Sequence, residues 1–343
     1  MAATVTALPL AGAEHVAMRE AWGQALVDLA GRYPDLLVLD GDLANSTRAD
    51  IFAEAVPDRF FEMGIAEQNL LGVAAGLATV GYVPWISTFT AFLAKRALDQ
   101  IRVVIAQPHL NVKLCGSYSG ILTGKTGKTH QSVEDVAVFR AMPGVVTIAP
   151  ADAVELRSAM AAMMETPGPI YLRLTRDPSP TIFPSDYTFR IGEGVLLRDG
   201  GDIGLVGTGT QTVRVLEAAD LLAAEGIAAS VLHLPTLKPL DTAALVALAD
   251  RTGALVTAED HSIIGGLGGA VAETLSEEHP TPSAASAGGT PTANPAPTTR
   301  CWRSTVSRPG TSRTRPAIFF ARCGRDSRNG VHARRDHRRA SPA

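Results

Sequence analysis

Four short polar clusters hold the side chains of this sequence that could do chemistry. They supply carboxylates, a histidine and an arginine, the groups that move protons or bind anions at enzyme sites. Each cluster follows an expected strand or opens an expected helix, at the edge of an open α/β sheet where ligands gather. The clusters are Asp40–Thr47, Gly64–Asn69, Gly124–Gln131 and Leu174–Pro178.

Taken singly, each cluster also has a purely structural explanation. Glu67 at a helix start is favoured by the helix dipole, and Arg176 at a strand end could form a surface ion pair. Lys125 and Lys128 follow glycines as in a phosphate loop, but the run lacks the spacing of a Walker motif. Gly265–Gly269 lacks the GxGxxG pattern of a dinucleotide loop, and we reject that assignment.

Helical and strand patterns alternate through the first 175 residues, which predicts a parallel sheet covered on both faces by helices. The expected strands are 35–40, 82–87, 109–115, 145–149 and 169–174. The expected helices are 17–31, 66–79, 89–106, 133–141 and 151–164. The helix at 66–79 is rich in leucine, alanine and glycine, so we expect it to pack closely against another backbone.

A proline-rich link at 177–184 leads into a second unit of the same kind. Its expected strands are 202–207, 228–234 and 254–258, and its expected helices are 211–225, 241–250 and 267–276. We therefore predict the α/β class, with two three-layer, parallel-sheet domains at residues 12–182 and 190–282.

The composition excludes several classes of protein. A formal net charge of −3 argues against a nucleic-acid or membrane-surface protein. No apolar run reaches the roughly 18 residues of a membrane helix, and the first residues lack the basic start of a secretory signal. The three cysteines have no metal-ligand spacing, so neither a disulfide framework nor a zinc site is expected. We expect a soluble cytoplasmic protein.

Taken together, the clusters resemble the transketolase family. Those of the first unit are similar to its pyrimidine-binding domain, and motifs of the second unit to its carboxy-terminal domain. The resembling stretches, in family order, are Asp40–Thr47, Pro57–Asn69, Ser87–Arg102, Thr129–Gln131, Leu237–Asp241 and Glu259–Gly268. The chain thus resembles the carboxy-terminal subunit of a split transketolase, with a pyrimidine-binding domain and a carboxy-terminal domain.

The resemblance implies thiamine diphosphate as the cofactor, a group that stabilises carbanions. It implies that Glu67 hydrogen-bonds the pyrimidine ring nitrogen and so favours the imino tautomer that removes the thiazolium proton. Phe89 and Phe92 would form the aromatic wall on which the aminopyrimidine packs. Without the motif around them, these two phenylalanines would be assigned to ordinary core packing. Asp42 matches a family aspartate near the cofactor.

The resemblance also implies a substrate site. His130 matches the family histidine that bonds substrate hydroxyls and helps proton transfer. Arg176 and Ser46 match positions that hold a sugar phosphate, for which a planar guanidinium is well suited. One departure affects this site, because the family reads Gly-Glu-Asp-Gly where this chain has Gly124–Gly127. Thr126 thus replaces an acid expected to touch a substrate hydroxyl, so the ketose or acceptor preference is expected to differ.

A second polypeptide is implied as well. The family binds Mg²⁺ and the cofactor's diphosphate through a Gly-Asp-Gly…Asn signature in an amino-terminal domain. Asp40–Asp42 is not that signature, and we expect no metal site on this chain. An N-terminal-half transketolase subunit would supply the metal ligands, in an α₂β₂ assembly that transfers a two-carbon ketol unit between phosphorylated sugars. Alone, this chain is expected to be inactive.

Other functions remain open. The related reactions are those of 1-deoxyxylulose-5-phosphate synthase and of the β subunit of 2-oxo acid dehydrogenases. His130 and Arg176 suit phosphorylated sugars rather than a lipoyl arm, and the synthase normally carries both cofactor halves in one chain. An inactive partner subunit is the non-catalytic alternative, although the intact Glu67, His130 and Arg176 argue against a long-standing loss of function.

The end of the chain has a different composition. Residues 283–343 carry 12 arginines, no lysine and two acids, with little apolar pattern. This composition is typical of a nucleic-acid arm or of a disordered end, and we favour the second.

A shifted reading frame would explain this end. Residues 289–311 can be back-translated into DNA and read in a shifted frame. One permitted set of codons then encodes a sequence that resembles the family's usual Asp-Thr-Tyr-Gly-Glu-Ser-Gly…Tyr-Gly-Leu ending. We hypothesise that the frame shifts near Pro282, which would truncate the second domain at 282 and leave 283–343 as an Arg-rich tail. Resequencing codons 275–290 tests this, because an unambiguous in-frame read would overturn it.

Overall fold

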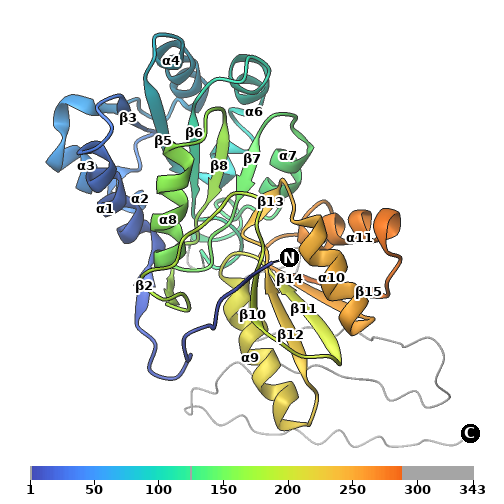
Figure 1. The fold of residues 1–343 in the computed structure, drawn as a ribbon. Coiled ribbons are helices and arrows are strands. Elements are labelled where there is room, and N and C mark those ends of the chain that lie inside the picture. Colours follow the sequence, from blue (N-terminus) through green and yellow to red (C-terminus); the bar gives the residue numbers. More distant parts are fainter. Residues whose placement is uncertain (1, 124–125, 288–343) are drawn as a thin grey trace, which may run out of the picture.

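The computed structural model describes residues 2–123 and 126–287. In this part of the chain, no helix is long and apolar enough to cross a membrane. Two large sheets, each packed against helices, organise the chain (Figure 1). This arrangement confirms the predicted α/β class with two sheet domains.

The first domain is built on a seven-stranded sheet with the order β13-β7-β8-β6-β5-β3-β4. Neighbouring strands are parallel except β13, which pairs antiparallel with β7. The strands are β3 (Leu36–Asp40), β4 (Phe60–Glu62), β5 (Val83–Phe89), β6 (Lys113–Ser117), β7 (Val146–Ile148), β8 (Ile170–Arg173) and β13 (Thr236–Lys238). Because the first six run parallel, their carboxyl ends lie at one edge of the sheet.

Two apolar layers sandwich this sheet. Strand β3 is buried along its whole length, and its side chains alternate between the two layers. One layer lies against α1 (Met18–Ala30), α3 (Asp50–Ala55) and α8 (Ala153–Met164). The other lies against α4 (Glu67–Thr79), α7 (Asp135–Ala141) and the π-helix η2 (Ile101–Ala106).

Shorter elements connect the strands and helices of this domain. They are α2 (Ala44–Thr47), η1 (Pro57–Arg59), α5 (Thr90–Leu93) and α6 (Leu98–Gln100). The single helix expected at 89–106 is therefore wrong in form, since β5 extends to Phe89 and α5, α6 and η2 divide the rest. The apolar positions of this stretch have helical spacing, but that spacing does not locate the breaks.

The second domain is built on a six-stranded sheet with the order β1-β10-β12-β11-β14-β15. Pairs are parallel except β10 with β12. The strands are β1 (Ala3–Thr4), β10 (Val195–Arg198), β11 (Ile203–Gly207), β12 (Ala229–His233), β14 (Leu255–Glu259) and β15 (Ser283–Ala287). Its helices are α9 (Gln211–Ala224), α10 (Thr242–Thr252) and α11 (Leu267–Glu278).

Strand β15 corrects the expected end of this domain. Residues from Ser283 onward were expected to lie in the tail, yet Ser283–Ala287 pair with all five residues of β14. The run Ser-Ala-Ala-Ser-Ala has weak strand propensity, so its place in the sheet comes from the open edge of β14 rather than from its own pattern. The rest of the predicted tail, residues 288–343, lies outside the described residues.

Each domain also contributes to the sheet of the other. Strand β1, from the start of the chain, pairs with β10, and β13, from the second domain, pairs with β7. A separate antiparallel pair joins β2 (His15–Ala17) to β9 (Pro178–Pro180). These exchanges cover edges that would otherwise expose backbone N–H and C=O groups.

Lys238 of β13 fixes the second domain to α7. Its Nζ donates to the carbonyls of Phe139 and Arg140 at 2.9 Å each, and also to that of Met142. Phe139 and Arg140 belong to the last turn of α7 and Met142 follows it, so the ammonium group binds carbonyls at the carboxyl end of this helix and complements the helix dipole. Asp241, three residues on, accepts from Ala244 N at 2.9 Å and caps α10.

We expect Lys238→Met to lower the free energy of unfolding by about 1–3 kcal/mol, because it removes the ammonium donor from half-buried carbonyls at the carboxyl end of α7. Urea unfolding of the full chain measures this change. The exposed ion pair of Arg190 with Glu193 provides the control, and Arg190→Met should shift the value by less than about 0.5 kcal/mol. Equal effects of both variants would refute the capping role of Lys238.

Candidate active site

An aromatic cluster lies where β5 and β6 end. The ring of Phe89, the last residue of β5, stacks on Tyr118 at 4.1 Å between centroids and lies 6.0 Å from Phe92. The imidazole of His130 meets Phe89 and Phe92 edge-on, at 5.8 and 5.4 Å. The structure thus brings together three residues predicted separately from the sequence, with Tyr118 in addition.

Glu67 opens α4 and is buried, with 1% of its side chain exposed. Both of its oxygens accept from Arg96 Nη1, at 2.7 and 2.8 Å. The same guanidinium lies over the ring of Phe92, 4.7 Å from its centroid. Arg96 therefore connects the buried carboxylate to the aromatic cluster, and its own side chain is 45% exposed.

A second set of polar groups surrounds Tyr118. Arg19 Nη1 donates to the hydroxyl of Tyr118 at 3.1 Å and to the carbonyl of Ser46 at 2.9 Å. The guanidinium of Arg176 lies 5.4 Å from the Tyr118 ring centroid and pairs with Asp177 at 3.1 Å. Hydrogen bonding to Tyr118 is the largest cause of the raised pKa of Arg176, which keeps this cation charged. Two residues predicted to hold a sugar phosphate therefore contact one tyrosine: Arg176 lies against the ring of Tyr118, and the carbonyl of Ser46 accepts from its hydroxyl at 3.3 Å.

Asp42 and its neighbour Asp40 have different surroundings. Asp42 is exposed, has a left-handed backbone with φ of 63°, and donates its N–H to Glu62 Oε1 at 2.9 Å. Asp40, the last residue of β3, is fully buried and accepts from Leu43 N at 2.6 Å. Burial raises the pKa of Asp40 to about 6. Asp40 organises the loop that carries Asp42 and Ser46.

The loop that carries His130 begins and ends at two residues that pair through their backbones. Gly120 and Ser132 form an isolated antiparallel bridge, with Gly120 N donating to Ser132 O at 2.8 Å. Gly120 has φ of +73°, and a Cβ there would lie 1.8 Å from Asp260 Oδ2 of the second domain. Only glycine fits this close contact. Within the loop, Thr126 Oγ1 lies 2.7 Å from Thr123 Oγ1, and Lys125 lies outside the described residues.

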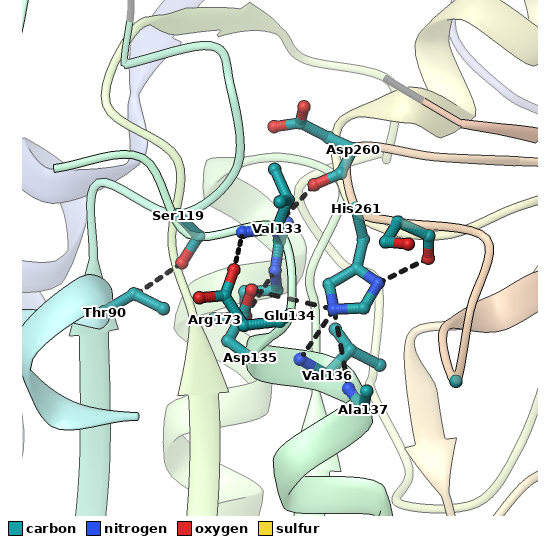
Figure 2. Close-up of polar contacts among 12 residues, drawn as sticks. Thr90, Ser119, Val133, Glu134, Asp135, Val136, Ala137, Arg173, Asp260 and His261 are labelled. Carbon is teal, nitrogen blue, oxygen red and sulfur yellow. Dashed lines mark hydrogen bonds and ion pairs between the residues drawn. The ribbon is translucent and has the colours of Figure 1, made fainter. Parts of the chain in front are cut away.

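A buried polar network fixes the end of this loop to the second domain (Figure 2). Asp135, at the start of α7, accepts from Arg173 Nε at 2.8 Å and from the hydroxyl of Tyr171 at 2.7 Å. Arg173 Nη2 donates to the carbonyl of Asp260 at 2.6 Å. His261 Nε2 accepts from the N–H groups of α7, with Val136 N at 3.1 Å.

The network fixes the charges of its members. Burial lowers the pKa of His261 and raises that of Asp260. A neutral His261 matches its geometry, because its Nδ1 donates to the carbonyl of Ser262 while Nε2 accepts at the start of α7. Burial disfavours the charge of Arg173, but Asp135 and Asp260 outweigh it and the pKa is raised overall.

Several residues of this candidate site were not predicted from the sequence. Arg96 and Arg19 were not assigned roles, because an arginine on a predicted helix is most often a solvated surface residue. Tyr118 follows an expected strand end, and that position was the available signal. Asp135 and Arg173 lack any signal in the sequence, since their pairing depends on how α7 and β8 pack together. In the described residues, no three His, Cys, Asp or Glu side chains are grouped as metal ligands.

Comparison with known families agrees with this architecture. The model "Transketolase, pyrimidine binding domain" matches residues 14–180, and "Transketolase, C-terminal domain" matches residues 192–304. The second match continues beyond the boundary expected at 282.

Individual relatives show the same similarity. A "Putative transketolase C-terminal section" of Methanocaldococcus jannaschii is 42% identical over 75% of this chain and 81% of the relative. A 6-deoxy-6-sulfo-D-fructose transketolase subunit of a Clostridium species is 41% identical over 77% of this chain and 82% of its own. A solved structure described as "Split gene transketolase, inactive beta4 tetramer" has a TM-score of 0.75 at 48% identity, covering 80% of this chain and 89% of that chain.

The chain therefore belongs to the transketolase family and is a subunit of the split-gene type, as its motifs suggested. Membership as a split subunit implies a partner with the N-terminal half. The two matched domains imply a general dependence on thiamine diphosphate.

We expect the stability of the chain to depend on pH through Asp40. Its pKa is higher in the folded than in the unfolded state, so its contribution is present below about pH 4 and is lost as pH rises through about 6. Asp40→Asn removes this dependence. The free energy of unfolding of the variant, relative to wild type, should rise by up to about 3 kcal/mol from pH 3.5 to 7. The exposed Asp58→Asn control should follow wild type, and parallel curves for Asp40→Asn would contradict the assignment.

Proposed function

We propose that this chain is the catalytic pyrimidine-side subunit of a thiamine diphosphate-dependent transketolase. In this proposal it transfers a two-carbon ketol unit from a ketose phosphate to an aldose phosphate. The observation that carries the proposal is the linkage of Glu67, Arg96 and Phe92, in which one guanidinium binds a buried carboxylate and covers an aromatic ring. A carboxylate beside an aromatic surface is what an aminopyrimidine ring requires.

The residues present fit the pyrimidine half of the cofactor. Phe89 and Phe92 offer ring faces, and Glu67 offers a carboxyl shielded from water. Arg96 holds both oxygens of Glu67, but it is 45% exposed and can give up one oxygen to a ring nitrogen. When bound, thiamine diphosphate would supply the electron sink for carbon–carbon bond cleavage.

The protein's own groups would bind and orient the sugar. His130, held edge-on against Phe89 and Phe92, presents an imidazole that can exchange a proton with a substrate hydroxyl. Arg176 and Ser46 both contact Tyr118, and we propose that a charged sugar terminus binds between them. Arg19 adds a second guanidinium to this end of the site. Asp42, in the neighbouring loop, stays a proposed cofactor contact.

The diphosphate and Mg²⁺ are assigned to the partner subunit in this proposal. The related chain described as an inactive beta4 tetramer supports the idea that such a subunit alone is inactive. We propose further that two copies of this chain and two copies of the partner form an α₂β₂ assembly in the cytoplasm. Each active site would then lie at the interface between the two kinds of chain.

Two features bear on the preference for the sugar. One relative is named for 6-deoxy-6-sulfo-D-fructose, which supports testing sulfonated as well as phosphorylated ketoses as donors. In this chain, Thr126 bonds Thr123 and offers a hydroxyl where the family pattern has an acid. A neutral hydroxyl recognises sugar hydroxyls less strongly than a carboxylate does, so we propose a ketose preference different from that of the pentose-phosphate enzyme.

The test is an activity assay of the complex recovered from native cells through a tagged copy of this chain. With thiamine diphosphate, Mg²⁺, a ketose phosphate and an aldose phosphate, wild type should form product, whereas the chain alone should not. We expect Glu67→Ala to lower kcat by about 100-fold or more, because the ring nitrogen loses its carboxyl partner. Glu54→Ala, which changes an exposed glutamate of α3, is the control.

Three outcomes would overturn the proposal. A complex that keeps its rate with Glu67→Ala removes the mechanism. Product formed from pyruvate and glyceraldehyde 3-phosphate, but not from ketose donors, would assign the deoxyxylulose-phosphate synthase reaction instead. A folded, cofactor-loaded complex with no activity on any donor would assign a non-catalytic subunit.

A further inference from the structure

Tyr118 has a backbone conformation that bulky residues rarely adopt. Its φ is 59°, in the left-handed region that favours glycine, yet the residue is buried, with 4% of its surface exposed. The next residue, Ser119, fixes the chain at this point (Figure 2). Its N–H donates to the carbonyl of Leu174 at 2.9 Å, and its hydroxyl lies 2.6 Å from that of Thr90. Backbone strain held in this way is common where a protein positions a ligand.

The side chain of Tyr118 contacts both ends of the candidate site. Its ring stacks on Phe89, with 4.1 Å between the centroids. Its hydroxyl donates to the carbonyl of Ser46 at 3.3 Å and accepts from Arg19 at 3.1 Å, and the guanidinium of Arg176 lies 5.4 Å from the ring centroid. One side chain therefore connects a ring assigned to the cofactor with the groups assigned to the charged end of the sugar.

The two arginines beside Tyr118 keep unsatisfied donors. In the part of the chain that the structure describes, the Nε atoms of Arg19 and Arg176 are buried and have no hydrogen-bond partner. The carboxylate of Asp177 engages Arg176 through Nη1. A buried donor without an acceptor is costly, and a guanidinium binds an anion well through two of its N–H groups. Both arginines can therefore bind an anion while Tyr118 stays in place.

The ring of Tyr118 then limits the space that is left for the carbon chain of the sugar. A sugar whose reacting end lies at Phe89 and whose charged end lies at the two arginines must pass beside this ring, because the ring adjoins both. Protein interiors are closely packed, and sites of this kind discriminate between ligands that differ by a single carbon. A smaller side chain at position 118 would leave room for a longer chain.

We propose that the ring of Tyr118 determines the length of the sugar that this site accepts, by limiting the space between Phe89 and the two arginines. The ligand is an open-chain sugar with a phosphate or another anion at its terminus, and the short members of this class bind best. The inference rests on the proposed function for the placement of the sugar. Binding without turnover is enough to test it.

The test measures the affinity of alditol phosphates of four, five and six carbons for the complex recovered with this chain, by isothermal titration calorimetry. These probes lack the carbonyl group that reacts, so they bind without turnover. We expect wild type to bind the six-carbon probe more weakly than the shorter ones. Tyr118→Gly removes the ring and suits the left-handed backbone, and it should reduce this preference for the shorter probes by about tenfold or more.

Two further variants separate the size of the ring from other roles. Tyr118→Phe keeps the ring and loses the hydroxyl, so it should keep the wild-type preference for length. Tyr82→Phe removes the hydroxyl of an exposed tyrosine and is the control, which should match wild type with every probe. If Tyr118→Gly does not fold, Tyr118→Asn takes its place, because asparagine also tolerates the left-handed region.

An equal change in affinity for all three probes in Tyr118→Gly would overturn the proposal. Wild type that binds none of the probes, or all of them equally, would overturn it as well. A complex that transfers ketol units but keeps its length preference in Tyr118→Gly would reject this inference and leave the proposed function standing. A length preference that depends on Tyr118, in a complex that transfers no ketol unit, would reject the proposed function and support the inference.

Discussion

The buried ion pair between Asp135 and Arg173 is the interaction on which the arrangement of both domains depends. It joins the start of α7 to the end of β8, and Arg173 also donates to the second domain at Asp260. Removing one partner would leave an uncompensated charge in a water-free junction, which is far costlier than losing a surface pair. Because the loop that carries His130 ends at α7, this junction also positions the imidazole among the aromatic rings.

The motifs of the second domain are explained by the same junction. Lys238 satisfies the carbonyl end of α7, and His261 accepts from its amino end. Glu259 accepts from the N–H groups of Leu267 and Gly268 at 2.7 and 2.9 Å, which caps α11. These residues are of types found at catalytic sites, yet Lys238 and His261 bind the two ends of α7, and Glu259 caps α11. The second domain therefore fixes the position of α7 in the domain that carries the candidate site.

The sequence predicted the layered α/β fold and most helices, because amphipathic spacing and buried strand runs are local patterns. It also predicted that Glu67, Phe92 and His130 belong to one site, since their motifs keep a family order. The breaks between α5, α6 and η2 were not predictable, because tertiary packing decides them. Strand β15 was missed for a related reason, as its alanines and serines pair only because β14 leaves an edge open.

A subunit that must fold before it meets its partner has to satisfy its own site groups. Here Arg96 neutralises Glu67, and Asp177 and Tyr118 engage Arg176. Both arginines keep part of their surface in water, so these contacts can exchange for a ligand at a smaller cost than a fully buried pair would impose. The Asp135–Arg173 pair is buried on both sides and cannot exchange in this way. The pairs at the candidate site are thus partly exposed and exchangeable, whereas the pair at the domain junction is buried and permanent.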